Sequence, residues 1–221
     1  MDVSNFVQTV AIYALPVLFA ITLHEAAHGY VARHFGDMTA YAQGRISLNP
    51  ARHIDFLGTI VVPLAILAVS KFTVGAGLLF GWAKPVPVNY SALRRPRQNM
   101  LWVAAAGPAA NLAMAFGWAL LLKISLLLPH STLSVPMGLM CKAGIEVNVV
   151  LMLLNLLPIL PLDGGRILAS LLPSRIAWGY AKLEPWGFPI LLLLLFSSAL
   201  GVILAPMVNF SFRVIGTVFQ I

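Results

Sequence analysis

Long apolar stretches with few or no charged residues alternate with short polar segments along the whole chain. A helix needs about 20 apolar residues to cross the hydrocarbon core of a membrane. Five stretches approach or exceed that length, and we expect a helix in each: residues 3–23 continuing to about 35, 56–70, 98–122 or on towards 128, about 143–162, and 186–212. The pattern predicts an all-α polytopic membrane protein with about five to six transmembrane helices.

The second stretch and the segment after it depart from this simple pattern. Residues 56–70 are short for a span and contain Pro63, so they could also form a shallow re-entrant segment. Between residues 75 and 97, prolines alternate with β-branched residues, notably in Lys84-Pro85-Val86-Pro87-Val88. This composition disfavours a helix, and we expect a short re-entrant extended, β-like segment. Such a backbone is tolerated at membrane depth only against protein or a wet cavity.

Composition supports a membrane protein and removes some alternatives. Of the 221 residues, 60% are hydrophobic and only 10% are charged, whereas soluble domains carry about 25% charged residues. The length fits a single domain. The single cysteine, Cys141, excludes an intramolecular disulfide framework and any zinc site that needs two cysteines, and we expect it to be a small apolar core residue. Asp2 precedes the first apolar stretch with no Lys or Arg, so we expect an uncleaved span there.

The net charge of +7 comes from basic residues that lie between the apolar stretches. They follow the first stretch, precede the third and follow the fourth: Arg33, Arg45, Arg52, Arg94, Arg95, Arg97, Arg166, Arg175 and Lys182. By the positive-inside tendency, these ends face the cytoplasm. Residues 71–97 must then return to the cytoplasmic side, either by crossing as an extended segment or because the second stretch does not cross. We expect the lipid bilayer as partner and no nucleic acid, since no recognition fold or basic helix is visible.

The first stretch ends in Thr22-Leu23-His24-Glu25-Ala26-Ala27-His28, an HExxH pattern in or beside a membrane span. On a helix, positions i and i+4 share a face, so His24 and His28 can bind one metal ion. Glu25 lies next to them, where a general base is needed to activate water. Because ionisable groups in a membrane segment are costly, they indicate a functional site. The pattern favours a zinc hydrolase inside the bilayer.

A catalytic zinc usually has three protein ligands, and the best third candidate is Asp163. It follows the uncharged run 147–162, in which Pro158 and Pro161 break the helix. By the charge argument it lies on the same side of the membrane as the two histidines. An alternative is that Asp163 caps a helix or pairs with Arg166.

Together, these motifs resemble the site-2 protease family of intramembrane zinc metalloproteases. The resemblance covers about residues 20–172, and the chain is similar to compact bacterial members without PDZ or CBS domains. HExxH alone is only moderately specific, whereas its combination with the downstream Asn155-to-Gly164 motif is strong. The matching motifs besides HExxH are Asn49-Pro50-Ala51-Arg52-His53-Ile54-Asp55, Gly81-Trp82-Ala83-Lys84-Pro85-Val86-Pro87, Gly107-Pro108-Ala109-Ala110-Asn111, and Asn155-Leu156-Leu157-Pro158-Ile159-Leu160-Pro161-Leu162-Asp163-Gly164.

The resemblance implies a role for each of these motifs. His24, His28 and Asp163 would bind one zinc ion per chain, and Glu25 would be the acid/base. Asn111 and Asn155 would flank the substrate and polarise the scissile carbonyl or stabilise an oxyanion, although the 107–111 motif could instead be a small-residue packing site. The re-entrant loop would hold an unwound substrate by strand addition, through Gly81, Trp82, Pro85, Val86 and Pro87.

The expected function is regulated intramembrane proteolysis, the hydrolysis of peptide bonds in or near transmembrane segments of membrane-anchored proteins. We expect one domain, 1–221, with a catalytic core at about 6–172 and a C-terminal helix at about 186–212, in a prokaryotic inner or plasma membrane with the active site towards the cytoplasm. His53 and Asp55 are expected to order a loop rather than bind metal. Two alternatives stay open: an ion-relay transporter, which predicts repeats that we do not see, and a non-catalytic relative, which the intact Glu25 disfavours.

Overall fold

The computed structural model describes residues 3–62, 65–66, 81–127 and 134–221. Within these ranges the chain is mainly helical and contains no regular strand. In the described part of the chain, four helices are long and apolar enough to cross a membrane: α1 (Val3–His34), α4 (Pro96–Leu127), α5 (Ser134–Asn155) and α9 (Ala199–Phe219). The predicted all-α architecture is confirmed, but the expected count of five to six spans is not.

Shorter elements connect the long helices. Between α1 and α4 lie α2 (Thr39–Ala42), the 3-10 turn η1 (Pro50–Arg52), the π-helical η2 (Phe56–Val61) and the 3-10 turn η3 (Tyr90–Ala92). After α5 come α6 (Asp163–Leu171), α7 (Ser174–Ala181) and α8 (Glu184–Phe196).

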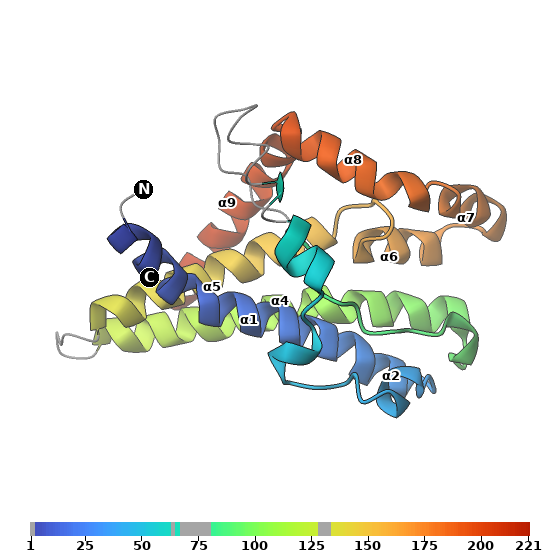
Figure 1. The fold of residues 1–221 in the computed structure, drawn as a ribbon, viewed down its shortest axis with the longest axis horizontal. Helices are drawn as coiled ribbons and strands as arrows, with labels where there is room; N and C mark the ends of the chain where they lie inside the picture. The colour runs from blue at the N-terminus through green and yellow to red at the C-terminus, as the bar shows by residue number, and fades with distance from the viewer. Residues whose placement is uncertain (1–2, 63–64, 67–80, 128–133) are drawn as a thin grey trace.

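The helices α1, α4 and α5 lie side by side, with α4 antiparallel to the other two (Figure 1). Small residues allow the backbones to approach closely, as is common in membrane bundles. Ala115 and Ala119 of α4 are completely buried, and a Cβ on Gly144 of α5 would lie only 2.4 Å from the ring of Trp118. The helix α6 packs on α4, while α9 packs on α5, α4 and α8. Cys141 is buried in the α4–α5–α9 core, as expected.

Local sequence explains most helix boundaries. Pro96 begins α4, where the missing N–H of proline costs no helical hydrogen bond. The chain after α1 turns at Gly36, whose φ of 104° favours glycine. The helix α5 ends at Asn155 rather than near 162, because Pro158 and Pro161 cannot continue it. It begins at Ser134 rather than near 143, so our predicted fourth span was displaced along the chain.

The predicted C-terminal helix over 186–212 is wrong as a single element. The structure has two helices there, α8 and α9, with a break at Ser197 and Ser198. Ser198 has a φ of 61°, a left-handed conformation that ends an α-helix. Both sides of the break are uniformly apolar, so hydrophobicity alone did not mark it.

The long connection between α1 and α4 begins and ends at the same end of the bundle. The backbone N–H of Arg94 donates to the carbonyl of Phe35 at 3.0 Å. Consequently α1 and α4 are antiparallel, whatever path the connection takes. Of the predicted second span over 56–70, residues 56–61 form η2, while 63–64 and 67–70 lie outside the described residues, as do 75–80 of the predicted extended segment.

Residues 81–89, which we call the extended segment, have no helical or strand assignment. The N–H of Trp82 donates to Gly58 O at 3.0 Å and that of Lys84 donates to His53 O at 2.8 Å. At the other end, Asn89 N–H donates to the buried carboxylate of Asp37 at 2.6 Å. The backbone is therefore held against the 53–58 loop by single hydrogen bonds, and the predicted β-like character is not confirmed.

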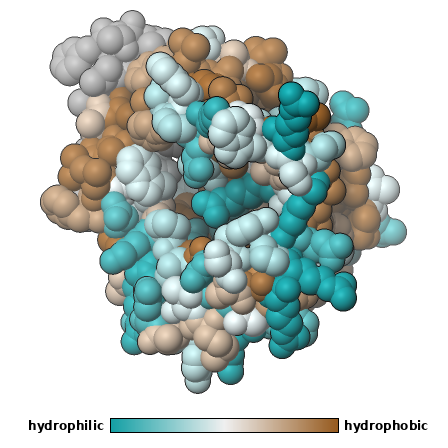
Figure 2. Space-filling view, turned by 90° about the vertical axis from the view of Figure 1, so that its right-hand side faces the viewer, coloured by the Kyte–Doolittle hydropathy of each residue, from teal (hydrophilic) through white to brown (hydrophobic). Residues whose placement is uncertain are grey.

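One end of the bundle is polar. Figure 2 looks onto the end where α6 and α7 lie and shows hydrophilic residues gathered around a central hollow, whereas both termini lie at the opposite end (Figure 1). Exposed basic residues from α1, the start of α4, α7 and its C-terminal boundary belong to this polar end: Arg33, Arg94, Arg95, Arg97, Arg175 and Lys182.

Candidate active site

The helix α1 carries His24 and His28 one turn apart, facing α4, and Asp163 is the first residue of α6. The Asp163 Oδ2 lies 3.2 Å from His24 Nε2 and 3.4 Å from His28 Nε2. The two Nε2 atoms are 3.1 Å apart. The structure thus brings the three predicted ligands together in a nearly equilateral triangle. All three residues are buried, with less than a tenth of their surface exposed.

The donor set fits a metal ion. Four tetrahedral ligands at zinc–ligand distances of 2.0–2.1 Å lie about 3.3 Å apart, close to the triangle edges. His28 Nδ1 lies 2.7 Å from the carbonyl of Val103, which can only accept, so Nδ1 carries the proton and Nε2 presents a lone pair. Asp163 Oδ2 is buried without a hydrogen-bond partner. The lone pairs of His28 Nε2 and Asp163 Oδ2 face each other with no proton between them, so a cation must lie there. In the described residues, no other group of three possible ligands occurs.

Burial raises the pKa of the Asp163 carboxyl, but when the Nε2 atoms of His24 and His28 carry protons, their hydrogen bonds and charge lower the pKa to about 2. The carboxyl is therefore ionised at neutral pH, as metal coordination requires. Two glycines let the chain place it there: a Cβ on Gly164 would lie 2.2 Å from Leu156 O, and one on Gly165 would lie 2.6 Å from Leu160 N. The start of α6 is folded tightly against residues 156–160, which follow α5.

Gly107 of α4 faces the histidines directly. A Cβ built on it would lie 2.4 Å from His28 Nε2 and 2.6 Å from His24 Nε2. Any larger residue would occupy the position that a metal ion needs. This gives the predicted 107–111 motif a specific physical function at its first residue, beyond general helix packing.

Glu25 is half-buried on α1, and its Oε2 accepts a hydrogen bond from the backbone N–H of Val86 at 2.7 Å. The extended segment therefore lies against the candidate base. Within it, Val86 is buried, Pro87 is half-buried, and Gly81 and Pro85 are exposed. Trp82 is also partly exposed, and its ring meets that of Phe188 in α8 edge to face at 5.2 Å.

The two asparagines that the resemblance indicated differ in position. Asn155 is the half-buried last residue of α5, and its Nδ2 donates to Leu151 O at 3.0 Å. Asn111 is fully buried behind His24, with its Oδ1 2.5 Å from His24 Nδ1. Its Nδ2 donates to Asn148 Oδ1 at 2.9 Å and to Ala20 O at 3.3 Å. Asn111 therefore contacts the side chain of a candidate metal ligand, and its expected position beside the substrate stays a prediction.

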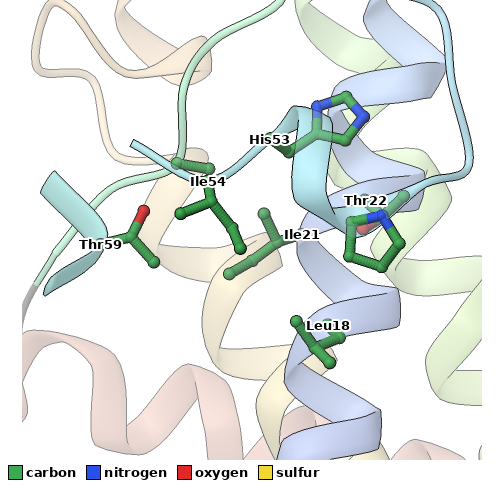
Figure 3. Close-up of a pocket in the computed structure, with 8 residues that line it drawn as sticks. Leu18, Ile21, Thr22, His53, Ile54 and Thr59 are labelled. Atoms are coloured by element: carbon green, nitrogen blue, oxygen red, sulfur yellow. The ribbon is translucent and has the colours of Figure 1, made fainter. Parts of the chain in front are cut away.

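A small pocket of about 30 Å³ lies between α1 and the 50–59 loop (Figure 3). Leu18, Ile21 and Thr22 line it from α1, and His53, Ile54 and Thr59 line it from the loop. Thr22 and Glu25 are three residues apart and share a face of α1. Because Thr22 lines the pocket, the pocket lies about one helical turn from the candidate base Glu25. Its volume suits a single methyl or hydroxyl group.

His53 and Asp55 order the loop, as expected. His53 Nε2 donates to Ser47 O at 2.8 Å, and Asp55 Oδ1 accepts from Gly58 N–H at 2.7 Å. Sequence reasoning missed the carbonyl of Val103, for which no side-chain signal exists. It also missed Asn148, although a lone amide in an otherwise apolar run is a usable signal.

The chain is similar to proteins named as zinc metalloproteases. It is 39% identical over 199 residues to the Bacillus subtilis protein named "Putative zinc metalloprotease YwhC", which covers 88% of this chain and 84% of that protein. It is 29% and 28% identical to proteins named "Putative zinc metalloprotease Rip2" in Mycolicibacterium smegmatis and Mycobacterium tuberculosis, over 83% of this chain and 66% of each relative. No family model and no solved structure matches the chain. With the identity to the Bacillus protein extending over most of both sequences, the chain belongs to the site-2 protease family of zinc metalloproteases.

Proposed function

We propose that this protein is an intramembrane zinc endopeptidase that cleaves membrane-anchored proteins in or near their transmembrane segments. The observation that carries the proposal is the triangle of His24, His28 and Asp163 inside a bundle of apolar helices, with Glu25 adjacent. A site built for hydrolysis within such a bundle is accessible chiefly to membrane substrates. We assign one zinc ion per chain to the triangle.

The protein residues would divide the work as follows. Zinc, when bound, would lower the pKa of its water and polarise the scissile carbonyl as a Lewis acid. Glu25 accepts the proton of the attacking water on its carboxylate and returns it to the leaving amine. The Val86 N–H holds one carboxylate oxygen at 2.7 Å and so fixes the direction of the other. Asn155 at the end of α5 is our candidate for the group that stabilises the oxyanion.

We propose that substrate binds beside the extended segment. A transmembrane helix must unwind locally before cleavage, because its carbonyls are shielded by hydrogen bonds within the helix. Unwound backbone needs new partners, and an extended protein segment next to Glu25 can offer them by strand addition. The residues involved would be Gly81, Trp82, Pro85, Val86 and Pro87.

We propose that the polar end with the active site faces the cytoplasm of a prokaryotic cell, in its inner or plasma membrane. Exposed arginines and lysines at this end favour that orientation by the positive-inside tendency. The site residues lie near this end, so the expected cleavage is towards the cytoplasmic side of the substrate span.

The test is cleavage by purified, zinc-loaded protein in detergent and in liposomes. The probe is a single-span test protein that carries Asn-Pro within its apolar helix, with an all-leucine version as the intact-helix control. Wild type should cut the Asn-Pro helix within or beside the span and cut the leucine helix more slowly. The Glu25→Gln variant should retain zinc and lose at least about 100-fold in rate, the usual range of general acid–base catalysis. Equal cleavage by this variant and wild type would contradict the assignment.

A further inference from the structure

A fully buried chain of hydrogen bonds connects three spanning helices to one metal-ligand candidate. Asn148 of α5 and Asn111 of α4 both have no exposed surface, and the second contacts His24 of α1. Polar side chains are costly at this depth unless every hydrogen bond is made. The two amides are therefore well suited to hold the His24 side chain in one orientation.

The direction of each bond in this chain is determined from its far end. Asn148 Nδ2 lies 2.8 Å from the backbone carbonyl of Gly144, which can only accept. The amide nitrogen of Asn148 must face that carbonyl, so its Oδ1 faces Asn111. Asn111 must then present Nδ2 to this oxygen at 2.9 Å, and the carbonyl of Ala20 at 3.3 Å requires the same orientation.

With Nδ2 of Asn111 committed in this way, its Oδ1 faces His24 Nδ1 at 2.5 Å. An amide oxygen is an acceptor, so His24 Nδ1 must carry the proton. The Nε2 of His24 then presents a lone pair to the triangle, as Nε2 of His28 does because of Val103 O. Reversal of either amide would place two acceptors or two donors against each other.

We propose that Asn148 and Asn111 form a directional relay that fixes the tautomer and the orientation of His24 for metal binding. Asn111 acts directly on His24, and Asn148 is a positioning residue that acts through Asn111. The inference rests on the metal site of the proposed function but not on proteolysis. Its test is metal affinity, so it can fail while peptide cleavage succeeds.

The experiment measures zinc affinity of purified protein by competition with a chelating dye, and the visible spectrum of the Co²⁺-loaded form. Replacement of a partner that orients a metal-binding histidine typically costs about 10- to 100-fold in affinity. We expect that loss for Asn111→Leu, about 5-fold for Asn148→Leu, and an altered Co²⁺ spectrum in both.

The double variant separates a relay from ordinary helix packing. If Asn148 acts through Asn111, Asn148→Leu should cause no further loss of zinc affinity in the Asn111→Leu background. Ser125→Ala is the matched control, because Ser125 is a buried polar residue of α4 that bonds only to Leu122 O in the described residues. Unchanged zinc affinity in Asn148→Leu, or losses that add in the double variant, would overturn the relay.

Discussion

Gly107 determines how closely α4 approaches the two histidines of α1. Its missing side chain leaves the space in which the three candidate ligands converge, since a Cβ there would fall within 2.4–2.6 Å of both imidazoles. Hydrogen bonds on the far side of each ring, to Asn111 and to Val103 O, turn the Nε2 atoms towards that space. The missing side chain of Gly107 on one side of the histidines and the hydrogen bonds to Asn111 and Val103 O on the other side therefore shape the site together.

Gly107→Ala should weaken zinc binding without unfolding the protein. Forcing a methyl group into a packed site typically costs about 1–3 kcal/mol, which corresponds to roughly 5- to 150-fold in affinity. The matched control is Gly117→Ala in the same helix, where a Cβ would meet nothing within 4 Å. Zinc competition assays on both variants check the prediction, and equal affinities would show that α4 does not confine the site.

The candidate ligands and the candidate base could be identified from sequence because each belongs to a short pattern. The spacing of His24 and His28 is a property of one helix, and Asp163 follows a proline-broken apolar run. The partners of the histidines could not be predicted in the same way. Val103 contributes only a backbone carbonyl, and the position of Asn111 behind His24 depends on the packing of two helices.

At the scale of elements, the extended segment lies against the candidate base Glu25, and we propose that it also binds substrate. Its backbone N–H groups donate hydrogen bonds at three points: Lys84 to the 53–58 loop, Val86 to Glu25, and Asn89 to Asp37. Its irregular backbone could be predicted from the proline spacing, because proline excludes helix. Its contact with Glu25 joins residues 61 positions apart in the sequence, and no local pattern reports that.

Val86→Pro removes the N–H that holds Glu25. Loss of a hydrogen bond to a charged group costs about 1.5–3 kcal/mol, so the rate of cleavage should fall roughly 10- to 100-fold while zinc stays bound. Val86→Ala keeps the N–H and shortens only the buried side chain, so it should retain most activity. Peptide cleavage and zinc content are measured together, and an equal loss in both variants would assign the effect to packing instead.

The C-terminal break at Ser198 shows the opposite limit of sequence reasoning. The apolar stretch was recognised correctly, but its division into α8 and α9 depends on a single left-handed residue between equally apolar halves. A span predicted from hydrophobicity gives the extent of membrane contact, not the continuity of the helix.

At the scale of the whole molecule, the described helices form a bundle with the candidate active site at its polar end and both chain termini at the other end (Figure 1). The bond between Arg94 N–H and Phe35 O closes the α1–α4 connection at the polar end. How the chain returns to this end between α1 and α4 stays a prediction, because 63–64 and 67–80 lie outside the described residues.

Cysteine labelling tests the orientation. In a Cys141→Ala background, which contains no other cysteine, Lys182→Cys should react with a membrane-impermeant maleimide in inverted membrane vesicles but not in intact spheroplasts. Gln220→Cys, at the end of α9, should show the reverse pattern. Labelling of Lys182→Cys from the outside of spheroplasts would contradict a cytoplasmic active site.

The most direct test of the account is zinc stoichiometry in purified protein, measured for wild type, His24→Ala, Asp163→Ala and the control His53→Ala. His53 is a buried histidine outside the triangle, so its replacement should leave the metal in place. We expect near one zinc ion per chain in wild type and His53→Ala, and strong loss in the other two. Zinc that is absent from wild type, or that survives in Asp163→Ala, would contradict a metal centre shared by α1 and α6.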